Sequence, residues 1–269
     1  KYIFTVKRGS QMNFFKTNIK LFVTISLSIM LTSCSSSNID SKIYELRTYY
    51  CHEGKLDDLN SRFRNHTVKL FEKHGMENIG SWTHNEKEDV LIYVLAFPDL
   101  EARKKSWTSF SQDPVWQKAY EASKLNGPLV KEIDSVIMDQ LDYSNVHANL
   151  NENKNKSFSL RTYYTNENKL VDLNSRFRNH TTKLFPKHGI ENIGYWVPQG
   201  EDNMLIYIVA FENEKSMSKS WESFVNDPEW KKAKSKSIEN GMLVDKIINE
   251  NLTPCLLYTS DAADEEDSV

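Results

Sequence analysis

Two kinds of hydrophobic spacing alternate along this chain. Residues 43–50 show the two-residue alternation, rich in aromatic and β-branched side chains, that is typical of a β-strand. Between Leu56 and Phe71 the apolar residues fall instead at helical spacing. The pair His74-Gly75 supplies a C-terminal cap for this helix. The chain therefore begins its ordered part with a strand followed by a helix.

The next seventy residues continue this alternation of strands and helices. The pattern predicts a short strand, a strand buried on both faces, a helix that is interrupted at Asp113-Pro114, and a last strand. These elements are expected at residues 78–83, 90–97, 100–110 with 116–125, and 130–142. The order βαββαβ is that of a ferredoxin-like module, in which two helices cover one face of an antiparallel sheet.

The whole pattern occurs twice, at a constant offset of 114 residues. Asp58–Thr67 returns letter for letter as Asp172–Thr181, and Trp82 aligns with Trp196. One offset serves throughout without a gap, which identifies an internal duplication. We therefore expect two modules, at residues 43–143 and 158–254, joined by a polar linker at residues 144–157.

A ferredoxin-like module leaves one face of its sheet without a covering layer, and an apolar sheet face must find a partner. Two similar modules in one chain meet that need by packing sheet to sheet. The predicted fold class is therefore α+β, with two tandem ferredoxin-like modules that form a pseudo-dimeric α/β barrel.

The N-terminal region is typical of an exported lipoprotein. Residues 12–33 contain a short basic segment and then a short apolar segment, as a signal peptide does, and the apolar run is too short for a comfortable transmembrane span. It ends in Leu31-Thr32-Ser33-Cys34, which resembles a lipobox; an ordinary signal peptide with an incidental cysteine is the alternative. We expect a lipid anchor on Cys34 in a bacterial cell envelope, facing the periplasm or the surface. Residues 34–42 then form a tether, and residues 1–11 resemble translation upstream of the start.

The C-terminal sequence, the net charge and the cysteines restrict the domain boundary, the partners and the disulfides that we expect. Residues 255–269 have no counterpart in the first repeat and resemble an artefactual or disordered acidic tail. The net charge of the whole chain is −3, and it stays −3 when the leader and this tail are left out. Near-neutral charge argues against nucleic acid as a partner. Of the three cysteines, Cys51 then stands alone, so no structural disulfide is expected.

An ordered set of short motifs resembles the NIPSNAP family. The set comprises Tyr44-Glu45-Leu46-Arg47-Thr48-Tyr49, Lys73-His74-Gly75, Ile79-Gly80-Ser81-Trp82, Asp99-Leu100-Glu101-Ala102-Arg103 and Asp113-Pro114-Val115-Trp116, and most of it recurs in the second repeat. The second repeat departs at Ser159, where the first has Glu45. It departs again at residues 215–218, so a site that needs Glu45 or Arg103 exists once at most.

The resemblance implies the dimeric α/β-barrel version of the ferredoxin-like fold. Its implications for activity are weaker: eukaryotic members are associated with mitochondria and with vesicle or mitophagy roles, and bacterial members lack an established activity. The barrel superfamily also includes small oxygenases and isomerases, so the fold permits an enzyme without requiring one.

Two histidines are candidates for acid–base chemistry. His66 and its copy His180 lie within the repeated helix, and His66 shares a predicted face with Phe63 and Leu70. It is either a histidine at the edge of the core bonded to a backbone group, or a general acid or base at the mouth of a cleft. His66 and His74 are eight residues apart, about 12 Å along a helix, so they cannot share a metal ion.

A strand face supplies the candidate ligand-binding residues. Arg47 and Tyr49, with their copies Arg161 and Tyr163, would point into a cavity if their face lined the barrel interior. A small anionic ligand would suit them, and the alternative is that Arg47 is paired with Glu45 at a sheet edge. Two tryptophans, Trp82 and Trp196, pack the core or form a ligand-stacking wall.

No local sequence motif indicates a metal or cofactor site. The chain has no His-x-x-x-His or Cys-x-x-Cys pair, no glycine-rich phosphate loop and no nucleophile elbow. We therefore expect neither a metal nor a cofactor. Two functions stay open: a small-molecule-binding or scaffolding protein, and a metal-independent oxygenase or isomerase.

Overall fold

The computed structural model describes residues 42–146, 150 and 155–255 of the chain. The leader, Cys34 and most of the tail, on which several expectations fall, lie outside these residues. Within them, no helix is long and apolar enough to cross a lipid bilayer.

The first module folds in the predicted order of elements. Its strands and helices are β1 (Ile43–Cys51), α1 (Leu56–Arg62), the π-helical turn η1 (Phe63–Thr67), α2 (Val68–Lys73), β2 (Glu77–His84), β3 (Val90–Phe97), α3 (Leu100–Gln112), α4 (Pro114–Ser123) and β4 (Val130–Gln140). The interruption at Asp113-Pro114 is confirmed, because the Asp113 side chain accepts a hydrogen bond from Val115 N and Pro114 begins α4. Gly75 follows α2 with φ of 74°, a left-handed conformation that suits a helix end.

The second module repeats this arrangement. Its elements are β5 (Ser157–Thr165), α5 (Leu170–Arg176), the π-helical turn η3 (Phe177–Thr181), α6 (Thr182–Leu184), the 3-10 turn η4 (Phe185–His188), β6 (Glu191–Pro198), β7 (Met204–Phe211), α7 (Glu214–Asn226), α8 (Pro228–Ser237) and β8 (Val244–Pro254).

The repeated segment Arg-Phe-Arg-Asn-His-Thr makes an irregular turn that the helical spacing did not predict. In each copy its last five residues form a π-helical turn. The hydroxyl of Thr67 donates to the carbonyl oxygen of Arg62 at 3.3 Å, and Thr181 donates to Arg176 at 3.4 Å. The wider turn changes which side chains point toward the core, and such turns occur often at functional sites.

The eight strands close into one barrel in the order β1-β3-β2-β8-β5-β7-β6-β4. Within each module the first strand lies between the third and the last along most of its length. Two short seams join the modules: β2 pairs with β8 at Trp82–His84, and β4 pairs with β6 at Met138–Gln140. The expected pseudo-dimeric barrel is confirmed.

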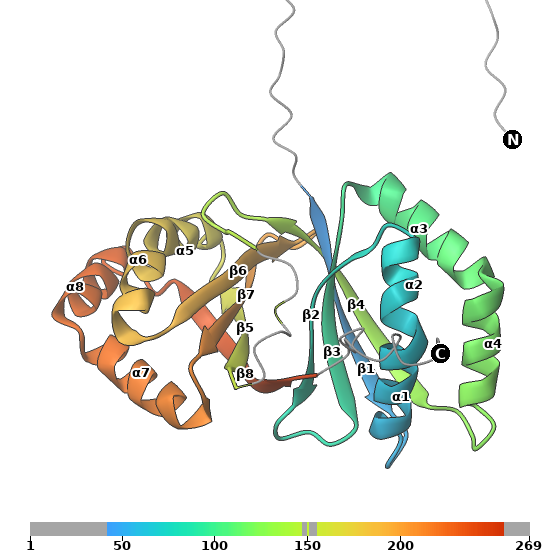
Figure 1. Ribbon diagram of the computed structural model, residues 1–269. Coiled ribbons are helices and arrows are strands. Elements are labelled where there is room, and N and C mark those ends of the chain that lie inside the picture. The colour runs from blue at the N-terminus through green and yellow to red at the C-terminus, as the bar shows by residue number, and fades with distance from the viewer. Residues whose placement is uncertain (1–41, 147–149, 151–154, 256–269) are drawn as a thin grey trace, which may run out of the picture. The chain divides into compact units, whose positions relative to one another are not determined.

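The barrel has an apolar interior and carries its helices outside. Alternate residues of the strands, among them Tyr44, Leu46 and Ile92 with Phe158 and Leu160, form one buried cluster that draws on both modules. In each module the helices pack against the opposite face of the strands (Figure 1), over a separate core. The strands β3 and β7 are therefore covered on both faces, whereas much of β4 and β8 is exposed.

The fold extends one residue beyond the expected boundary at Pro254. Cys255 is buried in the core of the first module, and its N–H donates to the carbonyl oxygen of Ser81 at 2.8 Å. Neither Cys51 nor Cys255 is in a disulfide. The residue expected to begin the tail thus belongs to the packed protein, because β8 carries it across the seam into the other module.

Candidate functional site

The side chains of Glu45, Arg47 and Tyr49 lie on the helix-covered face of β1. The barrel interior takes the alternate residues Tyr44 and Leu46 instead. The condition set in the sequence analysis, that this face lines the barrel interior, is therefore not met, and Arg47 pairs with Glu45 as the alternative had it. Two-residue alternation separates the two faces of a strand but does not say which face turns inward.

In the first module the buried carboxylate of Glu45 balances the positive charges of Arg47 and Arg103 on this face. Glu45 is fully buried and accepts hydrogen bonds from Arg47 at 2.7 Å, from both Nε and Nη2 of Arg103, from Trp107 Nε1 and from Ser135 Oγ. Burial alone would raise its pKa. The donors from Arg103, Ser135 and Trp107, with the charge of Arg47, outweigh burial and lower the pKa to about 2. Arg47 is therefore held by a permanent counter-charge.

The second module has the same arginine without the carboxylate. Ser159 replaces Glu45, and its hydroxyl donates to Asn249 Oδ1 at 2.6 Å. Arg161 Nη1 donates to the same amide oxygen at 3.0 Å, and the arginine Nε is buried without a partner among the described residues. The guanidinium lies over the Trp221 ring, 4.5 Å from its centroid. No described carboxylate forms an ion pair with Arg161.

A cavity opens beside this arginine, between β5 and β8 on one side and α5, α7 and α8 on the other. Its volume is about 470 Å³, within the range of small-molecule sites. It is lined by Arg161, Tyr163, Arg176, Trp221, Phe224, Val225, Trp230, Lys234, Ile238, Met242, Leu243, Val244, Asp245 and Ile247. The lining is mostly apolar and contains three cationic side chains against one carboxylate.

The first module is filled at the matching place. A smaller cavity of about 180 Å³ remains there, lined by Tyr49 but not by Arg47. Tyr120 packs on Trp116, with ring centroids 5.5 Å apart, and Arg62 lies over the Tyr120 ring. The second module has the exposed Lys234 in place of Tyr120. Five of the cavity-lining positions differ between the modules, among them Lys234 in place of Tyr120 and Ile238 in place of Lys124, and the second module also lacks the ion pairs of Glu45.

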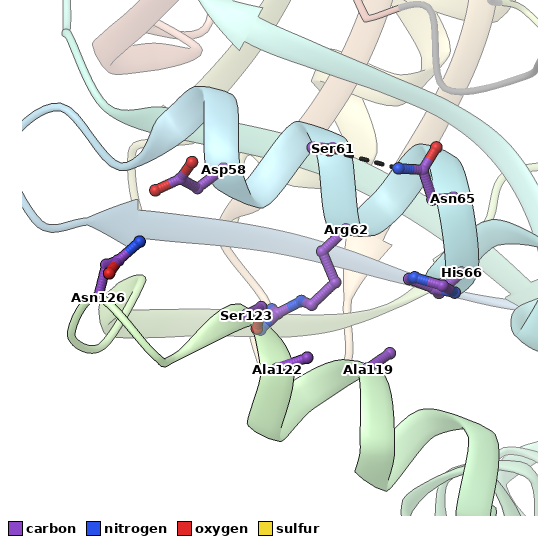
Figure 2. Close-up of a pocket in the computed structure, with 9 residues that line it drawn as sticks. All are labelled: Asp58, Ser61, Arg62, Asn65, His66, Ala119, Ala122, Ser123 and Asn126. Carbon is purple, nitrogen blue, oxygen red and sulfur yellow. Dashed lines mark hydrogen bonds between the residues drawn. The ribbon is translucent and has the colours of Figure 1, made fainter.

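The histidine candidates lie away from this cavity. His66 and His180 are exposed and line two matching grooves, the first between α1 with η1 and α4 (Figure 2). The interpretation of His66 as a core-edge histidine is wrong, because the π-helical turn rotates it out of the face that buries Phe63 and Leu70. The two histidines belong to different modules and do not share a groove.

The tryptophan candidates are inside the barrel. Trp82 and Trp196 are fully buried there, with ring centroids 5.5 Å from Phe158 and Tyr44 respectively. They line neither the grooves nor the cavity beside Arg161. Their position agrees with the packing alternative, not with a ligand-stacking wall.

A relay of polar side chains was missed by the sequence reasoning. His74 contacts Ser109 Oγ through Nδ1 at 3.0 Å and Asp113 Oδ2 through Nε2 at 2.8 Å, and His188 makes the matching contacts in the second module. Asp113 also caps α4 and pairs with Lys73. These bonds fasten the end of α2 to the corner between α3 and α4. Both His74 and Asp113 recur at the common offset of 114 residues, and this repetition was the sequence signal for the contact between them.

The described residues contain no group of three or more His, Cys, Asp or Glu side chains that could hold a metal ion. The cavity instead offers hydrogen-bond donors and cations: Arg161, Arg176 and Lys234, with the hydroxyl of Tyr163. Such a set is suited to recognising an anionic group by charge-assisted hydrogen bonds.

The architecture defines the class of this protein as a dimeric α/β barrel formed within one chain. The family comparison is more specific: the family model NIPSNAP matches residues 44–145 and again residues 158–256. The two matches coincide with the two modules and cover most of the chain. The chain therefore belongs to the NIPSNAP family.

Two solved structures share the fold at low sequence identity. A proposed monooxygenase from Lactobacillus acidophilus NCFM has 11% identity and a TM-score of 0.56, covering 80% of this chain and 94% of that one. A proposed monooxygenase from Fusobacterium nucleatum has 10% identity and a TM-score of 0.56, with 80% and 93% covered. An uncharacterised NIPSNAP domain protein from Burkholderia xenovorans has 19% identity and a TM-score of 0.34, with 38% and 96% covered. No curated protein sequence matches the chain significantly.

Proposed function

We propose that this protein binds a small molecule, with an apolar body and one oxyanion group, in the cavity of the second module. The observation that carries the proposal is the guanidinium of Arg161, which lines the cavity and pairs with no described carboxylate. Apolar side chains of α7, α8 and β8 would surround the body of the ligand. A carboxylate would accept a hydrogen bond from Arg161, as Glu45 does from Arg47 in the first module.

The chemistry of the lining supports this choice of ligand. Arg176 and Lys234 add positive charge to the side of the cavity that α5 and α8 form, whereas the only carboxylate among the lining residues, Asp245, is exposed. Opposite charges attract more strongly where water is excluded, so a partly buried arginine discriminates well between anionic and neutral ligands.

Calorimetric titration with octanoate, phenylacetate and 1-octanol tests the proposal. The carboxylates should bind and the alcohol should bind at least about tenfold more weakly, since it offers no charge to Arg161. Arg161→Ala should remove this preference, while the matched variant Arg47→Ala should leave binding unchanged because Glu45 already occupies Arg47. Equal losses in both variants would reject the cavity of the second module as the site.

A second candidate function is turnover of the bound molecule by a metal-independent oxygenase or isomerase. The likeness of the fold to two proposed monooxygenases favours it. So does the hydrogen bond between the hydroxyls of Tyr163, at the cavity, and the buried Tyr207, 3.1 Å apart, which could pass a proton. Oxygen uptake in the presence of hydroquinone should then fall in Tyr163→Phe with ligand affinity unchanged. Uptake that Tyr163→Phe does not lower would exclude the Tyr163 hydroxyl from the reaction, and no uptake above the rate without protein would leave binding without turnover as the function.

We propose in addition that Cys34 anchors the protein to a bacterial envelope membrane. The support is the apolar segment that ends in Leu-Thr-Ser-Cys. In a bacterial host, radiolabelled palmitate should enter the protein and should be lost in Cys34→Ala. Label that persists in this variant would refute the anchor.

A further inference from the structure

Each module carries a polar groove between its first helix and its fourth. The groove of the first module has a volume of about 290 Å³, and the matching groove of the second module about 260 Å³. The first groove is separate from the cavity proposed above as the octanoate site, whereas the second groove shares Arg176 with that cavity. Figure 2 shows the first groove, with Arg62 extending from α1 toward Ser123 of α4.

A buried guanidinium forms the floor of each groove. Arg62 is 6% exposed and Arg176 is 8% exposed. Arg62 Nη1 donates to Ser123 Oγ at 3.0 Å, whereas its Nε is buried and has no partner among the described residues; the Nε of Arg176 is in the same condition. No described carboxylate forms an ion pair with either. A buried charge without a counter-charge is unfavourable, so an anion in the groove would be stabilising.

The guanidinium is held in place before any ligand arrives. Arg62 lies over the Trp116 ring, 5.1 Å from its centroid, and Arg176 lies over Trp230 at 5.2 Å. The second arginine also donates to a serine, Ser237, at 3.2 Å. An arginine fixed by stacking and by one hydrogen bond loses little conformational freedom when it donates to an anion.

The remaining lining supplies further donors. Hydroxyl, amide and imidazole groups surround the arginine in the first groove: Ser61, Asn65, His66, Ser123 and Asn126. Asp58 also lines it, and the Lys55 ammonium, 3.1 Å from the carboxylate, offsets its charge. The same pair recurs as Lys169 and Asp172.

A comparison of α4 with α8 shows which positions of the groove the two modules share. The two helices differ at five of ten positions, yet eight of the nine residues that line the first groove have the identical residue in the second. The exception is Ala122, whose counterpart Lys236 adds a cation to the second groove. Close approach of the helices would account for a small residue at Ala119, but not for the repetition of the exposed Asn126.

We propose that each groove binds a small oxyanion, a phosphate or carboxylate group, on its buried arginine, and that the second groove binds more tightly through Lys236. The inference does not depend on the ligand proposed for the cavity of the second module.

The test is an NMR titration of the full chain with sodium phosphate at constant ionic strength, and separately with acetate. The imidazole signals of His66 and His180 report on the two grooves individually, because each histidine lines one of them. Both signals should shift and saturate, His180 at the lower concentration. The anion with the lower half-saturation identifies the preferred group.

Surface variants keep the test independent of folding. Ala122→Glu places a carboxylate in the first groove at an exposed position and should weaken binding there by about tenfold, with the His180 response unchanged. Lys236→Ala should bring the second groove to the affinity of the first. Arg64→Met removes an exposed cation that does not line the groove, and should change neither response.

The NMR titrations give different results if the grooves bind an anion and if they do not. Saturable shifts that respond to Ala122→Glu and Lys236→Ala support the proposal, and Arg161→Ala should leave them intact even if the cavity proposal fails. Shifts that do not saturate with either anion, or that persist unchanged in both groove variants, would overturn it.

Discussion

Arg47 Nη1 lies 2.7 Å from Glu45 Oε1, in an ion pair whose carboxylate is fully buried. At the matching position of the second module, Arg161 donates to the amide oxygen of Asn249 and lies over the Trp221 ring, and it forms no ion pair with a described carboxylate. A single duplicated arginine thus has a buried counter-charge in one module and, among the described residues, none in the other.

Transplanting the network of the first module should close the proposed site in the second. The triple variant Ser159→Glu, Met217→Arg and Asn249→Ser would give Arg161 a carboxylate partner, together with the arginine and the serine that donate to that carboxylate in the first module. We expect octanoate affinity to fall by at least about tenfold, since the new carboxylate competes with the ligand. Calorimetry measures this. Unchanged affinity in a folded triple variant would show that Arg161 does not hold the anion.

The stability of the protein should depend on pH through Glu45. Its pKa in the folded protein, about 2, is below the ordinary value of 4.5, because the donors around it outweigh the effect of burial. Its contribution to the free energy of unfolding is therefore complete above pH 4.5 and is lost as the pH falls toward 2. Glu45→Gln should lower stability at neutral pH by about 3 kcal/mol and flatten this acid dependence. Urea unfolding at several pH values measures both.

Ser159→Ala is the matched control for that variant. It removes one buried hydrogen bond at the same place in the second module and should cost about 1 kcal/mol without changing the pH dependence. An acid dependence in Glu45→Gln equal to that of the unmodified protein would show that other carboxylates dominate.

The glycine at position 80 should be needed for the packing of Trp82. A Cβ added there would lie 2.5 Å from the Trp82 ring. We expect Gly80→Ala to lower the free energy of unfolding by about 1–3 kcal/mol through overpacking. The cost should shrink when Trp82 is Leu, as a double-mutant cycle by urea unfolding can measure. An equal cost in both backgrounds would assign the effect to the backbone instead.

A single module should not remain monomeric. Residues 42–146 alone would expose the apolar interior face and leave the seam residues of β2 and β4 without partners. We expect dimers or aggregates in light scattering after size-exclusion chromatography. A stable, soluble monomer would contradict the role given to the seams.

The C-terminal boundary can be located by two truncations. Removal of residues 256–269 should leave the melting temperature unchanged, because this acidic segment has no counterpart in the first repeat. Removal of Cys255 as well should lower stability by about 1–2 kcal/mol, since its side chain is buried and its N–H is bonded to Ser81. Identical melting temperatures would place the boundary at Pro254.

The duplication made much of the fold predictable. Element order, the break at Asp113-Pro114 and the need for a sheet partner all follow from local spacing and from the repeat, and the structure confirms them. The orientation of Arg47 was not predictable, because alternation is symmetric between the two faces of a strand. The position of His66 was mispredicted because a π-helical turn shifts the periodicity on which the prediction depended.

The cavity itself depends on long-range substitutions that no local pattern signals. Tyr120 packs on Trp116 in the first module, whereas the matching Lys234 lines the cavity of the second. The effect of this substitution becomes visible only in the folded protein, where the Tyr120 ring lies under the Arg62 guanidinium.

Closure of the barrel within one chain also releases the modules from symmetry. In a homodimer every substitution is made twice, so an arginine that binds a ligand on one side must bind on the other. Here the covalent link lets Glu45 persist in one half while Ser159 replaces it in the other. The fused chain can assign rigidity to one half and recognition to the other, a division of labour that identical subunits cannot evolve.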